Sequence, residues 1–337
     1  YNVTVKGGKY LEAMAEADTI VFDKTGTLTK AQPTVVDVVP FCDKTPDELL
    51  RIGACLEEHF PHSMAKAVVN AAQDKGLIHE EFHSKVEYIV AHGISSKIND
   101  QKVVVGSYHF VFEDEESQIP EGMEEKFQEL PSEYSHLYMA IEGKLAAVIC
   151  IEDPLREEAP QIIKNLKAAG ISKVVMMTGD SDRTAKAIAK RVGVDVYYSE
   201  VLPEDKANFV EQEKAAGRKV IMIGDGINDS PALSAADIGI AISDGAEIAR
   251  EIADVTMSGD DLSEIVTLKL ISNKLMKRIH KNYRNIVGFN TALIILGVTG
   301  ILQPTVSALL HNTSTLYISL KSMENLLEEE NEVEEYI

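Results

Sequence analysis

Three shortages in the sequence limit what the protein can be. Its 337 residues include only 3 cysteines (Cys42, Cys55 and Cys150), and because they form no CxxC pair we expect reduced, buried thiols and no thiolate metal module. Basic residues are also scarce: the chain contains 33 Lys and Arg residues but 54 Asp and Glu residues. The resulting net charge of -21 excludes nucleic acid as a partner, because such binding needs basic patches. Internal repeats are lacking, and residues 324–337 predict a solvated, acidic tail.

The most informative segment of the chain is residues 21–29. Apolar residues at 19–22 predict a short buried strand that ends at Asp23, and Gly26 opens a turn directly after it. A carboxylate at the end of a parallel strand lies where α/β sheets bind their ligands. Such a carboxylate can attack phosphorus and become an aspartyl-phosphate. The segment therefore predicts a phosphoryl-accepting aspartate at position 23.

Three further motifs follow in the second half of the chain. Thr178 and Gly179 follow a predicted strand at 173–177, Lys206 lies in the predicted helix 205–216, and a Gly-Asp-Gly-Ile-Asn-Asp sequence begins at position 224 after another strand. Strand ends that carry Gly and Thr expose N–H groups and a hydroxyl, which can hold phosphoryl oxygens. Each motif alone could be a turn, a solvated lysine or a cation-binding loop. Their order, and their positions beside predicted strands, favour one joint site.

The pattern of apolar segments predicts a parallel sheet with an inserted domain. From residue 158 onward, helical and strand segments alternate: helices at 158–169, 184–192, 205–216 and 231–235, and strands at 173–177, 196–199, 219–223 and 238–242. The segment 36–150 differs, with helices at 46–57 and 64–74 and antiparallel strands at 86–98, 102–106 and 137–151. Turns are predicted at Gly93, Asn99-Asp100 and Glu142-Gly143. We therefore expect an α/β core that carries an α+β insert.

In these motifs and their order, the chain resembles the P-type ATPases, ion pumps with a haloacid-dehalogenase-like core, and in particular their heavy-metal-transporting branch. An Asp-Pro-Leu-Arg sequence at 153–156 adds to the resemblance, which covers essentially the whole chain. It implies a doubly wound parallel-sheet phosphorylation domain at 1–35 and 151–268, interrupted by a nucleotide-binding domain at 36–150. A linker helix with two transmembrane helices would follow at 269–323, before the acidic tail at 324–337.

The resemblance also implies a reaction in which ATP phosphorylates Asp23. Residues at the positions of Thr178 and Gly179 would bind the phosphoryl group, and Lys206 would offset the negative charge of the transition state. Related phosphatases carry a second aspartate two residues after the first, which helps to hydrolyse the phospho-enzyme. Here that position is Thr25, so we expect the intermediate to persist.

Magnesium and cofactor contacts are implied for a second group of residues. The Mg2+ ligands would be hard oxygen atoms: the Asp23 carboxylate, the Thr25 main-chain carbonyl, Asp225 and Asp229. Lys24 and Asn228 are assigned to cofactor binding by the same resemblance.

The nucleotide site implied for the insert departs from the family pattern. ATP would be bound by Glu57, His62, Gly93 and Gly106, where the glycines let the backbone approach the nucleotide. The family places proline after its histidine, whereas here Pro61 precedes His62 and Ser63 follows it, and the neighbouring His59 competes for the role. Ala91 and Ser107 replace a family glycine and asparagine, which predicts altered nucleotide contacts.

Two uncharged segments near the end of the chain, 286–302 and 305–320, predict a membrane hairpin, with a buried soluble hairpin as the alternative. Basic residues on both sides place its ends in the cytoplasm, so we expect a multi-pass protein of the bacterial plasma membrane that contacts lipid. His311 lies in the second segment and is a candidate ligand for the transported ion, or a partner in a helix–helix hydrogen bond. Imidazole and oxygen ligands favour Zn2+, Mn2+, Co2+ or Fe2+ over Cu+.

The sequence contains no Thr-Gly-Glu actuator loop and begins at Tyr1 without a signal peptide, so we expect a fragment that lacks the actuator domain and the upstream membrane helices. Such a fragment would form the phospho-enzyme without efficient turnover or transport. One alternative is a soluble haloacid-dehalogenase-like phosphatase, against which Thr25 argues. Another is a regulatory membrane protein with an inactive core, against which the complete set of Asp23, Lys206 and Asp225 argues.

Overall fold

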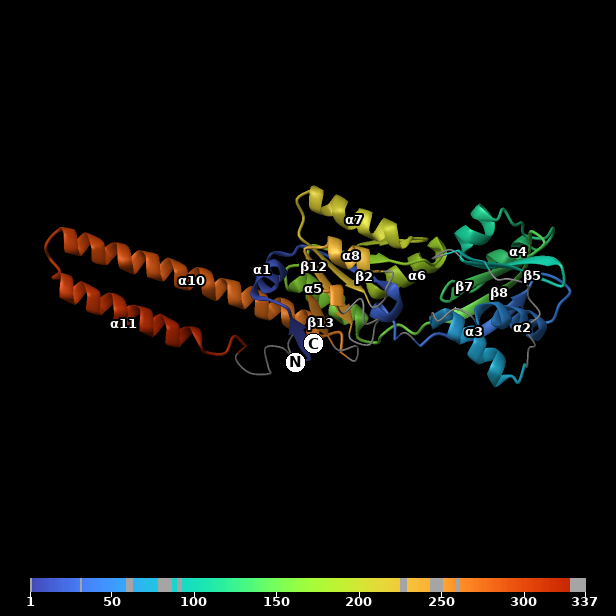
Figure 1. Cartoon of the computed structure of the whole chain (residues 1–337), viewed down its shortest axis with the longest axis horizontal. Coiled ribbons are helices and arrows are strands. Elements are labelled where there is room, and N and C mark those ends of the chain that lie inside the picture. Colours follow the sequence, from blue (N-terminus) through green and yellow to red (C-terminus); the bar gives the residue numbers. More distant parts are fainter. Residues whose placement is uncertain are drawn as a thin grey trace.

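The structure is a computed structural model that describes residues 2–30, 32–58, 63–77, 87–89, 93–224, 229–242, 251–257 and 261–327. Three parts follow one another along its long axis (Figure 1). A helical hairpin projects from one end, a seven-stranded sheet with its helices lies in the middle, and a six-stranded sheet with its own helices lies at the other end.

The central sheet has the order β1-β13-β12-β11-β2-β9-β10 and is parallel except at its β1 edge. Its strands are β1 (Val3–Val5), β2 (Thr19–Asp23), β9 (Lys173–Met177), β10 (Val196–Tyr198), β11 (Val220–Gly224), β12 (Ile238–Ile242) and β13 (Val255–Met257). Strand β2 lies between β11 and β9, and all five of its residues are buried. Burial on both faces explains why these strands are continuous apolar runs rather than alternating ones.

Helices cover both faces of this sheet. Ile20 and Phe22 point into the core formed with α1 (Gly8–Glu16), α5 (Ala159–Ala168), α6 (Asp182–Val192) and the start of α10 (Glu264–Val298). Val21 points into the opposite core, formed with α7 (Pro203–Ala215) and α8 (Ser230–Ala235). The prediction of a doubly wound α/β core is confirmed.

The second sheet is antiparallel, with the order β3-β8-β7-β6-β5-β4. Its strands are β3 (Thr34–Pro40), β4 (Glu87–Ile89), β5 (Gly93–Ile98), β6 (Gln101–Gly106), β7 (Ser135–Ile141) and β8 (Lys144–Glu152). Helices α2 (Pro46–Glu57) and α3 (Ser63–Asp74) pack on one face, and the helical turn η2 (His109–Asp114) and α4 (Glu124–Gln128) lie with the core of the other. Because β3 pairs with β8, the chain enters and leaves the insert through adjacent strands.

Two tight turns set the register of the insert. Asn99 and Asp100 have φ values of 49° and 62°, and Glu142 and Gly143 have φ values of 50° and 72°. Positive φ at both central residues is the geometry of the two-residue hairpin turn that matches strand twist. The turns predicted at these positions are confirmed, and the second one divides the segment 137–151 into β7 and β8.

The hairpin consists of α10 and α11 (Pro304–Ser322), joined near their far ends and held together near the tail by Asn282 Nδ2, which donates to Ser322 Oγ at 2.7 Å. Across the described part of the chain, no helix combines the length and apolar character needed to cross a membrane. The spans predicted at 286–302 and 305–320 are therefore not confirmed. Helix α10 ends at Val298, inside the first of these segments, and the second segment contains the consecutive polar residues 311–315, His-Asn-Thr-Ser-Thr.

A buried lysine ties α10 to the end of α1. Lys269 is only 2% exposed. Its ammonium donates to the carbonyl oxygens of Met14 at 2.7 Å, Ala15 at 2.9 Å and Ala17 at 2.9 Å. These carbonyls end helix α1 and have no further helical N–H to accept from, so the lysine satisfies them and complements the negative end of the helix dipole. The same carbonyls directly precede β2, which carries Asp23.

We expect Lys269→Met to lower the free energy of unfolding by about 2–3 kcal/mol, because the helix end loses a charged hydrogen-bond donor while remaining buried. Urea denaturation monitored by circular dichroism would measure this. Lys277→Met, at an exposed position of the same helix, serves as the control and should change stability by less than about 0.5 kcal/mol. Equal losses in the two variants would contradict the anchoring role.

Candidate active site

A lysine shared by two carboxylates forms the centre of the site. Lys206 Nζ lies 2.6 Å from Asp23 Oδ1 and 2.7 Å from Asp229 Oδ1, and all three residues are buried. Asp23 is the last residue of β2, Asp229 directly precedes α8, and Lys206 lies in the first turn of α7. The structure therefore brings together three of the side chains predicted from separate motifs.

Steric crowding requires a glycine at the end of β11. A Cβ atom at Gly224 would lie 2.5 Å from Asp229 Oδ2, so only glycine leaves room for the carboxylate to turn back toward Lys206. Asp225 and Asn228, which were predicted for magnesium and cofactor contacts, lie outside the described residues.

A second buried ion pair lies on the other side of Asp23. Lys24 Nζ is 2.7 Å from Asp180 Oδ2 and donates to Ser135 Oγ at 2.9 Å. Thr178, at the end of β9, donates its hydroxyl to the same Asp180 oxygen at 2.7 Å. Burial opposes the charged form of Asp180, but the ammonium of Lys24 and the hydroxyls of Thr178 and Ser135 hold the pKa of this carboxyl below its ordinary value. Gly179 lies between Thr178 and Asp180 in the loop that follows β9.

The turn after Asp23 is held by hydrogen bonds between its backbone and two side chains. Gly26 has a φ of 73°, which a residue with a side chain rarely adopts, and its N–H donates to Thr29 Oγ1 at 2.9 Å. Arg156 Nε donates to the Thr27 carbonyl at 3.0 Å, so the Asp-Pro-Leu-Arg motif supports the turn from the returning chain. These contacts fix the turn η1 (Lys24–Leu28), and with it the main chain of Thr25 directly after Asp23.

The charge of this cluster is not balanced. Four carboxylates (Asp23, Asp153, Asp180 and Asp229) interact with two ammonium groups (Lys24 and Lys206), so carboxylates outnumber ammonium groups among the described residues of the cluster. Burial raises the pKa of Asp23 from 3.8 to about 6 despite the opposing effect of Lys206, and the nearby Asp229 adds to the increase. An excess of buried oxygen anions fits a hard divalent cation such as Mg2+. Within the described residues, no group of three or more His, Cys, Asp or Glu side chains is arranged to hold a metal, so the fit rests on Asp23, Asp229 and the Thr25 carbonyl.

The residues predicted for the nucleotide belong to the insert. Glu57 is the last residue of α2 and is 2% exposed, and Gly93 and Gly106 lie directly opposite each other on β5 and β6. A Cβ at Gly93 would lie 2.5 Å from the Val105 carbonyl oxygen and still closer to the Phe110 ring, so packing alone already requires glycine there. His62, His59 and Ala91 lie outside the described residues.

Ser107 stands where the family has asparagine, and it has a local structural role. Its hydroxyl accepts a hydrogen bond from the Phe110 N–H at 3.2 Å and so supports the helical turn η2. This contact places the Phe110 ring under Gly93.

His311 lies far from this site, in the hairpin. Its Nδ1 is 2.9 Å from Asn290 Oδ1 of α10. Of the two readings of this residue, the structure shows the helix–helix hydrogen bond, and the role of ion ligand stays a prediction.

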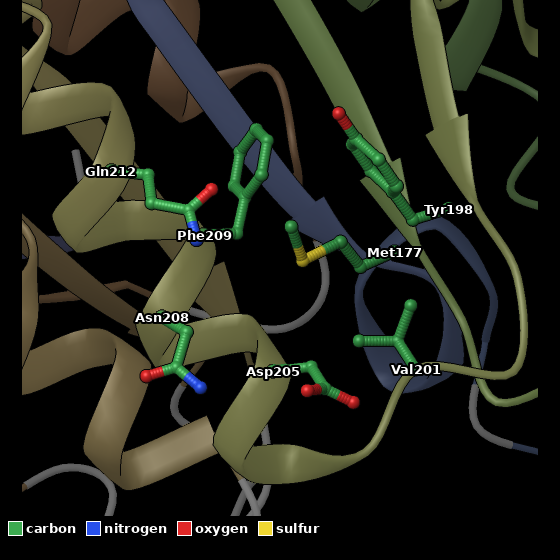
Figure 2. A pocket seen from close by; sticks show the side chains of 7 residues that line it. All are labelled: Met177, Tyr198, Val201, Asp205, Asn208, Phe209 and Gln212. Carbon is green, nitrogen blue, oxygen red and sulfur yellow. The ribbon is translucent and has the colours of Figure 1, made fainter.

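A hollow of about 270 Å3 lies beside α7 (Figure 2). The rings of Tyr198 and Phe209, 4.9 Å apart, and the side chains of Met177 and Val201 form its apolar part. None of the predicted catalytic or nucleotide-binding residues lines it, although Met177 directly precedes Thr178. The hollow is therefore a neighbour of the site rather than part of it.

Sequence reasoning did not assign roles to Asp180 or Ser135. Asp180 completes the Thr-Gly-Asp motif, so its position after a strand was a usable signal. Ser135 carries no motif, because it reaches Lys24 from 111 residues away.

A family model described as haloacid dehalogenase-like hydrolase matches residues 17–237. The chain therefore belongs to the haloacid dehalogenase-like hydrolases. The match includes Asp23, Thr178, Lys206 and Asp229, the residues that the fold brings to one edge of the central sheet.

Within this family, the chain is similar to heavy-metal-transporting P-type ATPases. It is 35% identical over 327 residues to the "Probable copper-exporting P-type ATPase V" of Mycobacterium tuberculosis, covering 95% of this chain and 41% of that protein. A zinc-transporting PIB-type ATPase in its E2.Pi state superposes with a TM-score of 0.66 at 28% identity, covering 97% of this chain and 52% of that one. The catalytic domain of the CPx-ATPase CopB-B gives a TM-score of 0.64 at 29% identity, covering 80% of this chain and 95% of that one. The chain thus spans about two fifths of the curated relative's length, and the resemblance drawn from its motifs is confirmed.

The raised pKa of Asp23 makes stability depend on pH. Because the folded-state value of about 6 exceeds the ordinary 3.8, the native state loses stability as pH rises from about 4 to 6 and the buried carboxyl ionises. We expect Asp23→Asn, in the presence of a chelator, to be more stable than the unmodified protein by on the order of 2–3 kcal/mol at pH 7.5 and by about half of that at pH 5. Urea unfolding at both pH values measures the difference. A gain that is the same at both would show that ionisation of Asp23 is not its cause.

Proposed function

We propose that Asp23 accepts the γ-phosphoryl group of ATP and that the full-length protein uses the resulting aspartyl-phosphate to drive transition-metal cations across a membrane. The observation that carries the proposal is the buried Asp23 carboxylate at the carboxyl end of the central strand, 2.6 Å from Lys206 and beside Asp229. This is the arrangement that in-line phosphoryl transfer needs: a fixed nucleophile next to a fixed positive charge.

In the proposed step, a carboxylate oxygen of Asp23 forms a bond to the γ-phosphorus while the bond from phosphorus to the β,γ-bridging oxygen breaks. ADP leaves with that electron pair, and the acyl phosphate remains on β2. Burial opposes the charged form of Lys206, but its two carboxylate partners hold its pKa above the ordinary value, so it stays protonated and its ammonium offsets charge on the transferred oxygens. Thr178 and Gly179 would contact those oxygens from the end of β9.

Magnesium, when bound, would neutralise phosphate charge and help to align the transferred group. The residues that would hold it are Asp23, the Thr25 carbonyl and Asp225, with Asp229 and Asn228 supporting the shell. The excess negative charge around Asp23 and Asp229 supports this assignment.

We assign residues 1–35 and 151–268 to phosphorylation and residues 36–150 to ATP binding. The similarity to the CopB-B catalytic domain supports this division, because that structure is described by its conformational changes upon nucleotide binding. Glu57, His62, Gly93 and Gly106 would hold the nucleotide, and Lys24 and Asn228 would lie near its phosphates.

The cargo that we propose is a borderline divalent ion, Zn2+, Mn2+, Co2+ or Fe2+. The similar proteins carry names with different metals, copper and zinc, so similarity alone does not choose one. His311 and Asn290 offer an imidazole and an amide oxygen within 2.9 Å of each other, a donor set that suits such ions better than Cu+.

The proposed intermediate is directly measurable. Incubation with γ-labelled ATP and Mg2+ should give protein-bound label that is stable in acid and removed by hydroxylamine, as expected of an acyl phosphate. Asp23→Asn should carry no label, because its amide is not a nucleophile of comparable strength.

Lys206→Met should lower the rate of labelling by about 100-fold, because it removes one electrostatic contact to the transition state. Persistence of the label in Asp23→Asn would rule out the assignment. Fast hydrolysis of a generic phosphomonoester without preference for ATP would favour the alternative of a haloacid-dehalogenase-like phosphatase.

A further inference from the structure

One hydrogen bond joins the insert to the residue next to Asp23. Lys24 Nζ, buried beside the acceptor aspartate, donates to the hydroxyl of Ser135 at 2.9 Å. Ser135 is 4% exposed and is the first residue of β7, where it lies opposite Ile151 of β8, the strand that returns the chain to the central sheet. The bond therefore lies at the base of the insert, close to the strands about which the insert can tilt.

Two other hydrogen bonds lie near this one, but neither involves Lys24 or Asp180. Thr184 Oγ1 of α6 donates to the Tyr134 carbonyl at 3.1 Å, and Arg183 Nη1 donates to the Gln128 carbonyl at 2.6 Å. Both join α6 to the segment that leads into β7. Ser135 differs from them because its partner is the Lys24–Asp180 ion pair, one residue from Asp23 in the chain.

Building on the proposed function, we propose that Ser135 is a positioning residue for phosphoryl transfer from ATP. Its hydroxyl ties the first residue of β7 to the Lys24–Asp180 pair and so fixes how the insert, with its bound nucleotide, sits over Asp23. The hydroxyl suits this task because it accepts from the Lys24 ammonium and also hydrogen bonds to the Asp180 carboxylate, so a small rotation of the insert would disturb both contacts. Lys24 serves as the link because its ammonium is held in the core by Asp180 and cannot follow the insert.

The test compares two phosphoryl donors. ATP needs the insert for its delivery, whereas acetyl phosphate is small enough to reach Asp23 without it. For Ser135→Ala we expect a 3- to 10-fold slower labelling of Asp23 by ATP, with the half-saturating ATP concentration unchanged within about twofold, because positioning rather than binding is lost. Labelling by acetyl phosphate should change by less than twofold, and Ser135→Thr, which keeps the hydroxyl, should recover most of the rate with ATP.

Arg183→Ala is the matched control, since it removes a contact between the same two parts that does not involve Lys24. We expect it to leave labelling by both donors within twofold of the unmodified protein. An equal loss with ATP and acetyl phosphate in Ser135→Ala would overturn the proposal, because Ser135 would then act on the chemistry at Asp23. A loss in Arg183→Ala as large as that in Ser135→Ala would also overturn it, because the link to Lys24 would not be special.

A readout without phosphorylation separates this proposal from the proposed function. Hydrogen exchange of the nucleotide-free protein should be at least 5-fold faster for amides of residues 132–137 in Ser135→Ala, at an unchanged melting temperature. Unchanged exchange would show that the bond does not hold the insert. If the unmodified protein took label from neither donor, the proposed function would fail, whereas faster exchange would still establish the tie between the two parts.

Discussion

Two buried carboxylates share the ammonium of Lys206, and the catalytic edge depends on this contact. Asp23 ends β2 and Asp229 directly precedes α8. Without a positive charge between them, their repulsion in a site with little water would drive them apart or neutralise one of them. The local sequence places the lysine. Pro203 occupies the first turn of α7, and Asp205 accepts a hydrogen bond from the Leu202 N–H at 3.2 Å, so the start of this helix is fixed where Lys206 leaves it. A helix start thus determines the position of the charge.

The sheet topology explains why motifs that are 150–200 residues apart meet. Strands β11, β2 and β9 are neighbours in the sheet and run parallel, so their carboxyl ends lie at one edge. Strand β2 lies between two strands that come much later in the chain, and an inserted domain separates it from them in sequence but not in space. Because β3 and β8 are paired, the insert leaves and returns at a single place and does not disturb the order of the central sheet.

Much of this arrangement could be predicted, and the exceptions have physical reasons. The strands 173–177 and 238–242 have the predicted bounds because they are continuous apolar runs with sharp polar ends. Strand β3 was not predicted, since its sequence, Thr-Val-Val-Asp-Val-Val-Pro, lies at a sheet edge and mixes exposed and buried positions. Gly93 was assigned to nucleotide approach, and its contact with Phe110 could not be known without the fold. The partner of Lys24 was equally hidden, because a lone serine gives no signal of a contact 111 residues away.

The charge imbalance at the site bears on how a phosphoryl donor reaches Asp23. The described carboxylates outnumber the ammonium groups, so this edge of the sheet repels a polyphosphate that arrives without a cation. Lys24, although positive, is compensated by Asp180 at 2.7 Å and has little free charge to offer. Attraction at the edge is therefore weak, and delivery of the donor must depend on where the insert holds it. The Ser135 hydroxyl fixes the insert against Lys24, the residue next to Asp23. This contact orients the bound donor toward Asp23, which electrostatic attraction alone cannot do.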